Sequence, residues 1–439
     1  MKMLLERAKG SALDVRSACL DRTDILALLS PHAQQFRTLD FTFDYWSNIR
    51  RFSEAVSGPL PLLRTLKINA IGTTPNPPSL PLFSGAVNLK NFSLRLEGAP
   101  FLNHFTFPTL TTFEFSAVDK RFPVSQLLNF LEALPTLQTV RIKIEAELLL
   151  GDVPPERVIV LPNVEIFSVT QGEPGYRIAP HISCPSASRI SLVREQDVEF
   201  EVPQEIFPTW NTIGPQYAAS TIDKVALGIT TIGGDLVSFS LSFLSPGSAT
   251  LELGYKLITG DEDSDESTPE LGWKYAEVLS HALKAIRTHP LLSNVKRLHI
   301  WDKHIFYNPR HLASMAKEAT GLFRFVGSLD ELVLDIDDLR LFLSPFLDLP
   351  ESQVSTEQST FPSIKALIIA EQSKDPFDEE CVAAIVGFVR SQHMRGVPFE
   401  RVVFHMTSPP AGMAERLEPW VCTVHFSEEM IPVDDQDSI

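Results

Sequence analysis

A nine-residue phrase that recurs along the chain constrains its fold more than any other feature. The phrase reads apolar, proline, any, apolar, any, any, apolar, any, apolar. Its six copies are residues 60–68, 107–115, 134–142, 161–169, 184–192 and 361–369. Because the chain has 33 prolines and is 44% hydrophobic, chance accounts for about one copy. Such recurrence predicts an array of similar structural units.

The last six residues of the phrase also recur without its proline. These shorter matches are Phe36/Leu39/Phe41, Leu89/Phe92/Leu94, Ile222/Val225/Leu227, Leu236/Phe239/Leu241, Val295/Leu298/Ile300, Leu329/Leu332/Leu334 and Phe399/Val402/Phe404. The middle apolar residues from Leu39 to Ile190 follow one another at steps of 21 to 27 residues. Those from Leu298 to Val402 follow at steps of 34 or 35. The regular steps indicate that the chain returns to an equivalent position in each unit.

Each of these cores alternates apolar and other residues, which predicts a short β-strand with one buried face. The proline is expected to start the strand, where no hydrogen bond of the sheet is lost. Helices are predicted over residues 271–287, from Asn308 to about residue 319, and from Asp375 or Asp378 through Val389. The predicted fold is therefore α/β: a curved solenoid with a parallel sheet on its concave side and helices or irregular returns on its convex side.

The Leu-x-x-Leu-x-Leu core resembles that of leucine-rich repeats, and the resemblance covers residues 36–404. The family usually has Asn or Cys three residues after the last apolar position of the core. The corresponding residues here are Asp44, Ile71, Glu97, Val118, Glu145, Gly172, Glu195, Lys303, Asp337, Gln372 and Thr407. The resemblance therefore implies an irregular, divergent array without the asparagine ladder of the family.

Three segments near the start of the chain resemble fungal F-box proteins with divergent leucine-rich repeats. They are residues 5–15 (LERAKGSALDV), similar to the segment after the F-box, 31–39 (PHAQQFRTL) and 58–63 (GPLPLL). The F-box itself, a Leu-Pro start and three helices ending near a Trp-Arg pair, is not visible before Leu5. The resemblance implies the substrate-binding part of a ubiquitin-ligase adaptor, which would recruit ligase subunits only through an F-box upstream of Met1.

The overall charge bears on which partners the chain can bind. Its 38 basic and 55 acidic residues give a net charge of −17, which argues against nucleic acid because a phosphate backbone requires a basic face. No apolar run is long enough to span a membrane, and the first residues have no signal-peptide core. We therefore expect an intracellular protein, cytoplasmic or nuclear. Its four cysteines are too far apart in sequence for a close-set metal or disulfide framework.

An acidic stretch divides the sequence into two arrays. Residues 261–270 carry six carboxylates, which repel one another and predict a solvated loop. The predicted organisation is a short-period array over residues 1–257, the acidic loop over 258–270 and a long-period array over 271–439.

A candidate protein-binding stripe lies on the predicted C-terminal strands. Residues between the apolar positions of each core should point away from the core, into the concave surface. In the N-terminal half these residues are polar and of mixed charge. The stripe comprises Arg297, His299, Trp301, Glu331, Val333, Asp335, Ile368, Arg401, Val403 and His405. An exposed apolar stripe with a polar rim is typical of an interface; alternatively a later segment, such as residues 406–426, covers the stripe and makes it core.

No P-loop, G-x-G-x-x-G, H-E-x-x-H or G-x-S-x-G motif occurs in the sequence. We therefore expect no enzyme activity, no catalytic residue, no cofactor and no metal site. The leading hypothesis is a protein-recognition module that resembles the substrate-binding part of an F-box ubiquitin-ligase adaptor and holds a protein target on its concave surface. A second hypothesis is a stand-alone repeat scaffold without ligase recruitment, and a third is an enzyme whose site is dispersed over loops.

Overall fold

In the computed structural model the chain is a mixed α/β protein in which parallel strands predominate. The structure describes residues 10–17, 28–43, 46–56, 58–70, 82–96, 102–118, 122–144, 148–149, 153–172, 178–197, 224–232, 236–244, 250–258, 295–303, 328–335, 339–340, 343, 347, 363–370, 378–406, 410 and 412–427. Contacts divide the chain into two units: Met1–Glu195 with Thr212–Gln216, and Gln196–Asn211 with Tyr217–Ile439. Most of the predicted acidic loop and the predicted helices over 271–287 and 308–319 lie outside the described residues.

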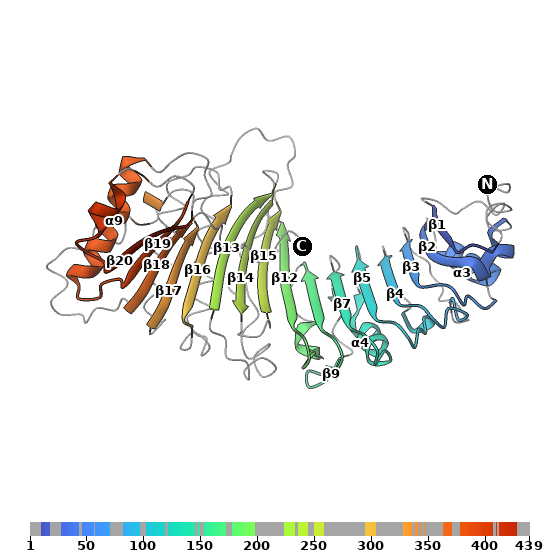
Figure 1. Cartoon of the computed structure of the whole chain (residues 1–439). Helices are drawn as coiled ribbons and strands as arrows, with labels where there is room; N and C mark the ends of the chain where they lie inside the picture. Colours follow the sequence, from blue (N-terminus) through green and yellow to red (C-terminus); the bar gives the residue numbers. More distant parts are fainter. Residues whose placement is uncertain are drawn as a thin grey trace. The chain divides into compact units, whose positions relative to one another are not determined.

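A parallel sheet of eight strands forms the first unit (Figure 1). In spatial order the strands are β1 (Leu13–Ser17), β2 (Phe36–Phe43), β3 (Thr65–Ala70), β4 (Asn91–Leu96), β5 (Thr112–Ala117), β7 (Thr139–Ile144), β10 (Ile166–Gln171) and β12 (Arg189–Asp197). The repeated cores pair in register, so that Leu39 lies opposite Leu66 and Leu66 opposite Phe92. The parallel strands predicted from the phrase are therefore confirmed in this unit.

Short elements return the chain from one strand of this sheet to the next. They are η1 (Ser30–Gln35), α3 (Trp46–Ala55), η2 (Leu102–His104), β6 (Phe122–Pro123), α4 (Val124–Glu132), β8 (Leu148–Leu149), β9 (Ile159–Val160), η3 (Ala179–His181) and β11 (Ile182–Ser183). β6 pairs with β8 and β9 with β11, both in parallel. Steps of 21 to 27 residues leave no room for longer helices once the strand and its turn are built.

In five of the six copies, the proline of the phrase occupies a tight turn and does not start the strand. In the sixth copy, Pro362 lies outside the described residues, and β18 begins at the next residue. In the copy at residues 60–68, the N–H of Leu63 donates to the carbonyl of Leu60 (3.2 Å), and β3 begins two residues later. The same bond closes the turns that begin at Phe107, Leu134, Leu161 and Cys184, at 3.1 to 3.4 Å. Proline is favoured at the second position of such a turn because its fixed φ angle suits that position. The predicted role of the proline was therefore wrong for these five copies.

A ladder of side-chain hydrogen bonds joins these turns from one repeat to the next. The third residue of each turn donates to the carbonyl of the second residue of the preceding turn. The pairs are Asn88 Nδ2 with Pro61 O (3.0 Å), Thr109 Oγ1 with Val87 O (2.9 Å), Thr136 Oγ1 with Pro108 O (3.2 Å) and Asn163 Nδ2 with Pro135 O (2.9 Å). The ladder precedes the strands, whereas the asparagine position of leucine-rich repeats follows them, so comparison with that family does not reveal it.

The turn ladder gives a testable expectation at Thr136, whose hydroxyl also donates to the carbonyl of Leu110 (2.7 Å). Replacing Thr136 with valine should lower the opening free energy of this turn by about 1 kcal/mol, because a hydrogen bond is lost with little change in shape. Hydrogen exchange of amides in residues 107–118 measures it. Thr139→Val is the matched control, since valine suits this half-exposed strand position. Equal effects of the two substitutions would contradict a role for the ladder.

Strands of the second unit form a sheet of mixed direction. In spatial order they are β15 (Thr250–Ile258), β14 (Leu236–Leu244), β13 (Lys224–Ile232), β16 (Arg297–Lys303), β17 (Ser328–Asp335), β18 (Ser363–Ala370), β19 (Arg401–His405) and β20 (Thr423–Ser427). β13 pairs in parallel with β16, and the strands from β16 to β20 pair in parallel with one another. The strands of the long-period array therefore pair as the steps of 34 and 35 residues predict.

The matches at Ile222 and Leu236 depart from the predicted parallel array. β13 and β14 are antiparallel, as are β14 and β15. Only residues 233–235 separate β13 from β14, whereas a parallel connection needs a dozen residues or more. The contacts assign these strands to the second unit, although residues up to 257 were predicted to belong to the first array.

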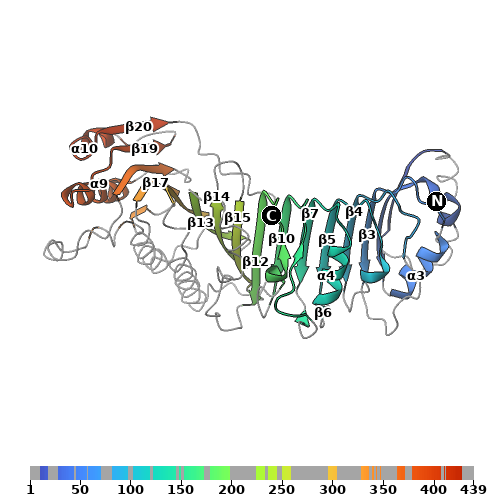
Figure 2. The ribbon, with the colours of Figure 1, turned by 90° about the horizontal axis from the view of Figure 1, so that it is seen from below.

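Helix α9 (Glu379–Met394) confirms one predicted helix and identifies its start. Asp378 is the N-cap: its carboxylate accepts a hydrogen bond from the backbone N–H of Cys381 (2.7 Å), one of the N–H groups that a helix leaves without an internal partner. Helix α10 (Met413–Leu417) contacts α9. Both helices lie at the same end of the second unit as β19 and β20 (Figure 2).

Candidate functional site

Four adjacent strands of the second unit bring the predicted stripe together on one face. The register of β16–β19 forms three rows across the sheet. The rows are Arg297–Glu331–Ala366–Arg401, His299–Val333–Ile368–Val403, and Trp301–Asp335 followed by Ala370–His405. The repeat spacing therefore predicted correctly which of these residues lie side by side.

The apolar part of the stripe is buried. Trp301 is 5% exposed, Val333 0% and Ile368 6%. Exposure rises only toward the edge of the sheet, where Val403 and His405 are half-exposed. Trp301, Val333 and Ile368 are therefore core residues, as the second of the two interpretations of the stripe predicted. They offer no free surface to a partner.

Residues 406–426 do not provide the cover that this alternative assigned to them. β20 pairs with β19 and so extends the sheet sideways. The ring of Phe426 stacks on that of Phe404 (5.3 Å between centroids), and Phe404 lies on the face opposite to the stripe because it alternates with Val403 and His405. Within the described residues, this segment therefore continues the sheet instead of crossing the stripe.

A polar pair lies within the buried stripe. His299 Nε2 is 4.0 Å from Asp335 Oδ2, and the two residues are 9% and 4% exposed. Trp301 lies opposite Asp335 in the register of β16 and β17. A buried carboxylate needs polar partners, and with so little exposure this pair joins two strands and is not presented to a substrate.

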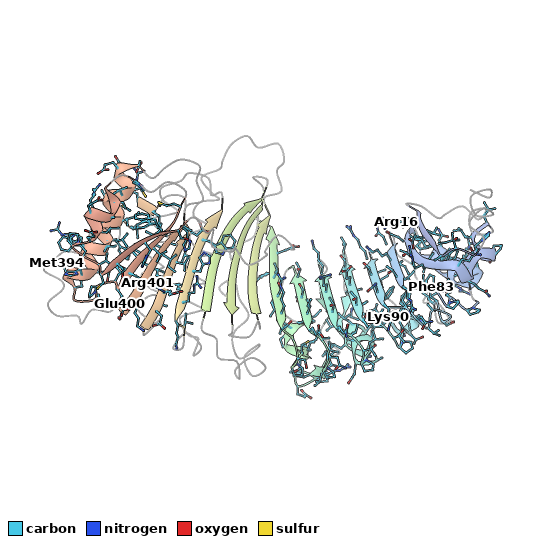
Figure 3. The ribbon with its side chains drawn as sticks, viewed as in Figure 1. Arg16, Phe83, Lys90, Met394, Glu400 and Arg401 are labelled. Carbon is cyan, nitrogen blue, oxygen red and sulfur yellow. The ribbon has the colours of Figure 1, made fainter. Side chains whose placement is uncertain are left out.

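The charged rim of the stripe remains accessible. Glu331 accepts a hydrogen bond from Arg401 Nη2 (2.7 Å) and forms an ion pair with Arg297, whose Nε lies 3.2 Å from Glu331 Oε2. Arg401 reaches Glu331 across β18, where the row holds only the small side chain of Ala366. Figure 3 shows Arg401 near the start of β19. These ion pairs link β16, β17 and β19 on one face of the sheet.

The first unit presents a second surface, called here the polar face, which is accessible from β1 to β10. On β12 the same face is buried at Ser191 and Val193. The apolar residues of β2–β10 point to the buried side, and the alternate residues are half-exposed or exposed. The polar face comprises Asp14, Arg16, Thr38, Asp40, Thr42, Thr65, Lys67, Asn69, Asn91, Ser93, Arg95, Thr112, Glu114, Ser116, Thr139, Arg141, Lys143, Ile166, Ser168 and Thr170. The predicted site omitted it, because apolar outward residues on neighbouring strands are the more usual mark of an interface.

Ion pairs organise part of the polar face. Arg37 donates to both carboxylate oxygens of Asp14, with 3.0 Å between Nε and Oδ1, and these hydrogen bonds lower the pKa of Asp14 to about 2. Arg141 pairs with Glu114 at 2.8 Å. All these side chains are substantially exposed, so each ion pair contributes little stability. A charged group of a binding partner can therefore replace one member of either pair at little cost.

Two observations on the described residues concern metal binding and cysteine reactivity. Among them, no group of three or more His, Cys, Asp and Glu could hold a metal ion. Cys184 is buried, and desolvation raises the pKa of its thiol to about 12, so it stays protonated near neutral pH and is a poor nucleophile. No helix within the described ranges is long and apolar enough to cross a membrane.

Comparisons with known proteins do not assign this chain to a family. No model of a protein family matches it, and no curated protein matches it.

Proposed function

We propose that this chain is a non-enzymatic protein-recognition module, built as a leucine-rich-repeat-like solenoid and similar to the substrate-binding part of an F-box ubiquitin-ligase adaptor. Its target is a protein held on the polar face of the first unit. The observation that carries the proposal is the alternation on β2–β10, where one face of the sheet is buried and the other presents polar side chains from successive parallel strands.

Repeat architecture supports this role. Each repeat contributes two or three outward side chains at a fixed position, so the array offers a broad surface that many small contacts can read. The turn ladder and the backbone bonds between repeats hold this surface rigid: the carbonyl of Arg64 accepts from the N–H groups of Lys90 and Asn91, and that of Lys90 from Thr111 and Thr112 (all 2.9 Å). A rigid surface loses less entropy on binding than a mobile one.

Purification of the protein from the cells that make it tests the adaptor role. We expect a species heavier than 48.9 kDa that brings a cullin and its linker protein, because an F-box upstream of Met1 would recruit them. Intact-mass measurement and mass spectrometry of the co-purified proteins give the answer. A species of 48.9 kDa without ligase subunits would contradict the adaptor role and leave the stand-alone scaffold.

A further inference from the structure

Unpaired positive charge is concentrated at one end of the polar face. Lys67 on β3 and Arg95 on β4 are exposed and form no ion pair among the described residues. Arg16 on β1 is also exposed (Figure 3). Within the outward residues of β2–β4, Asp40 alone carries a negative charge. On β1–β4 these three basic side chains therefore stand against two carboxylates, Asp40 and Asp14, and Asp14 is already paired with Arg37.

Two further basic residues stand at the start of the same strands. Arg64 Nη1 donates to the carbonyl of Asn88 and Lys90 Nζ to that of Thr109, each at 3.2 Å. These bonds engage neutral carbonyls, so both side chains keep their full charge. Figure 3 shows Lys90 at the foot of β4. The strand ends thus add to the positive potential of β3 and β4.

This positive charge occurs in a chain that is acidic overall. Residues 1–195 contain 20 basic and 18 acidic residues, whereas residues 196–439 contain 18 and 37. A basic surface on an otherwise acidic protein attracts negatively charged partners to that surface.

We propose that the polar face binds an extended, carboxylate-rich segment of the partner protein across β1–β7, with Lys67 and Arg95 as the central contacts. This inference rests on the proposed recognition function and names the chemistry of its target. Ser93 lies opposite Lys67 and Asn69 opposite Arg95 in the register of β3 and β4, and both offer polar groups to the peptide backbone. Among the described residues Arg141 pairs with Glu114 alone, and it supplies a further contact when a carboxylate of the peptide replaces Glu114.

The spacing of the basic residues suits an extended peptide. Neighbouring strands lie about 4.8 Å apart, so the five steps from β1 to β7 span about 24 Å, which a fully extended peptide covers with about seven or eight residues. Lys67 and Arg95 stand on adjacent strands, and Arg16 and Arg141 each lie two strands further out. Carboxylates on alternate residues of such a peptide point to one side and recur about every 6.6 Å, close enough to reach these cations through their long side chains.

The same face is a poor match for nucleic acid. Single-stranded nucleic acids bind on aromatic side chains that stack with their bases. Among the described outward residues of β1–β10 there is no aromatic side chain, because the phenylalanines of these strands point into the core. Asp40 and Glu114 would also repel a continuous phosphate backbone, whereas a peptide with spaced carboxylates can avoid them.

Charge reversal on the full-length chain tests the proposal. The probe is a fluorescent eight-residue peptide with glutamate at alternate positions, followed by anisotropy. We expect it to bind, and to bind more weakly as salt rises. Lys67→Glu combined with Arg95→Glu should weaken binding at least about tenfold, since two attractions become repulsions. Arg50→Glu with Arg51→Glu on α3 makes the same charge change and should alter binding by less than about twofold.

Other probes separate the alternatives. The same peptide with glutamine in place of glutamate should not bind, and a single-stranded RNA oligonucleotide should not bind more tightly than the acidic peptide. No binding of the acidic peptide, no loss on charge reversal, or tighter binding of RNA would overturn the proposal. Co-purified ligase subunits without peptide binding would overturn this inference alone, whereas peptide binding without ligase subunits would overturn the adaptor role alone.

Discussion

Replacing Trp301 with alanine is expected to destabilise the second unit by about 3 kcal/mol or more, because removing a buried indole loses its burial and leaves a cavity. Trp301 is 5% exposed and lies in the row beside Asp335, whose buried carboxylate would lose part of its packed surroundings. Hydrogen exchange measures the effect: amides of β16–β18 should exchange much faster, while those of β3–β7 in the other unit remain protected.

Trp420→Ala is the matched control for this experiment. Trp420 is half-exposed and rests against Arg390, 5.3 Å from its ring centre, and against the ring of His393 at 5.6 Å. Its loss should cost about 1 kcal/mol, as expected for an exposed cation–π contact. An unchanged stability of Trp301→Ala would contradict the buried position of the indole and reopen the stripe as a binding surface.

Register is the part of the structure that the sequence predicted well. Apolar residues at fixed steps, such as Leu332, Leu367 and Val402, must occupy equivalent places in successive strands if each is to be buried. A slip of one residue would expose the whole set. The rows across β16–β19 therefore followed from spacing alone, as did the alternation that defines the polar face.

Burial on the second face of these strands could not be predicted in the same way. Val333 and Ile368 are apolar residues at outward positions, and an apolar residue there fits either an interface or a covered sheet. The choice depends on which other segments pack there, a tertiary property that a local pattern does not contain. The polar outward residues of the first unit carry no such ambiguity, because covering Lys67 or Arg95 would require partners for their charges.

Connections explain the remaining differences. The short matches at Ile222 and Leu236 look like repeats, but their strands are joined by three residues and so must be antiparallel. The turn at Pro61 was mistaken for a strand start because proline is acceptable at either place. In both cases the pattern of apolar residues was correct, and the length or geometry of the connecting segment decided the structure.

Replacing Phe92 with alanine is expected to cost the first unit about 3–5 kcal/mol, the usual range for a buried phenylalanine. Phe92 is 1% exposed and lies at the centre of an aromatic cluster. Its ring is 5.0 Å from Phe105 and Phe107, 5.9 Å from Phe113 and 6.4 Å from Phe130. The substitution therefore removes contacts with the segment after η2, with β5 and with α4 together. Val87→Ala, at a residue 54% exposed, is the control and should change stability by less than about 0.5 kcal/mol.

The spread of this effect along the chain distinguishes an array from an ordinary globular core. In a repeat array each unit is stabilised mainly by its neighbours, so loss of Phe92 should increase exchange most in β3, β4 and β5 and less in β10 and β12. Hydrogen exchange resolved by peptide measures this gradient. A uniform loss of protection over β2–β12 would instead show one cooperative core, and the rigid polar face proposed for recognition would then depend on every repeat and not on its nearest neighbours.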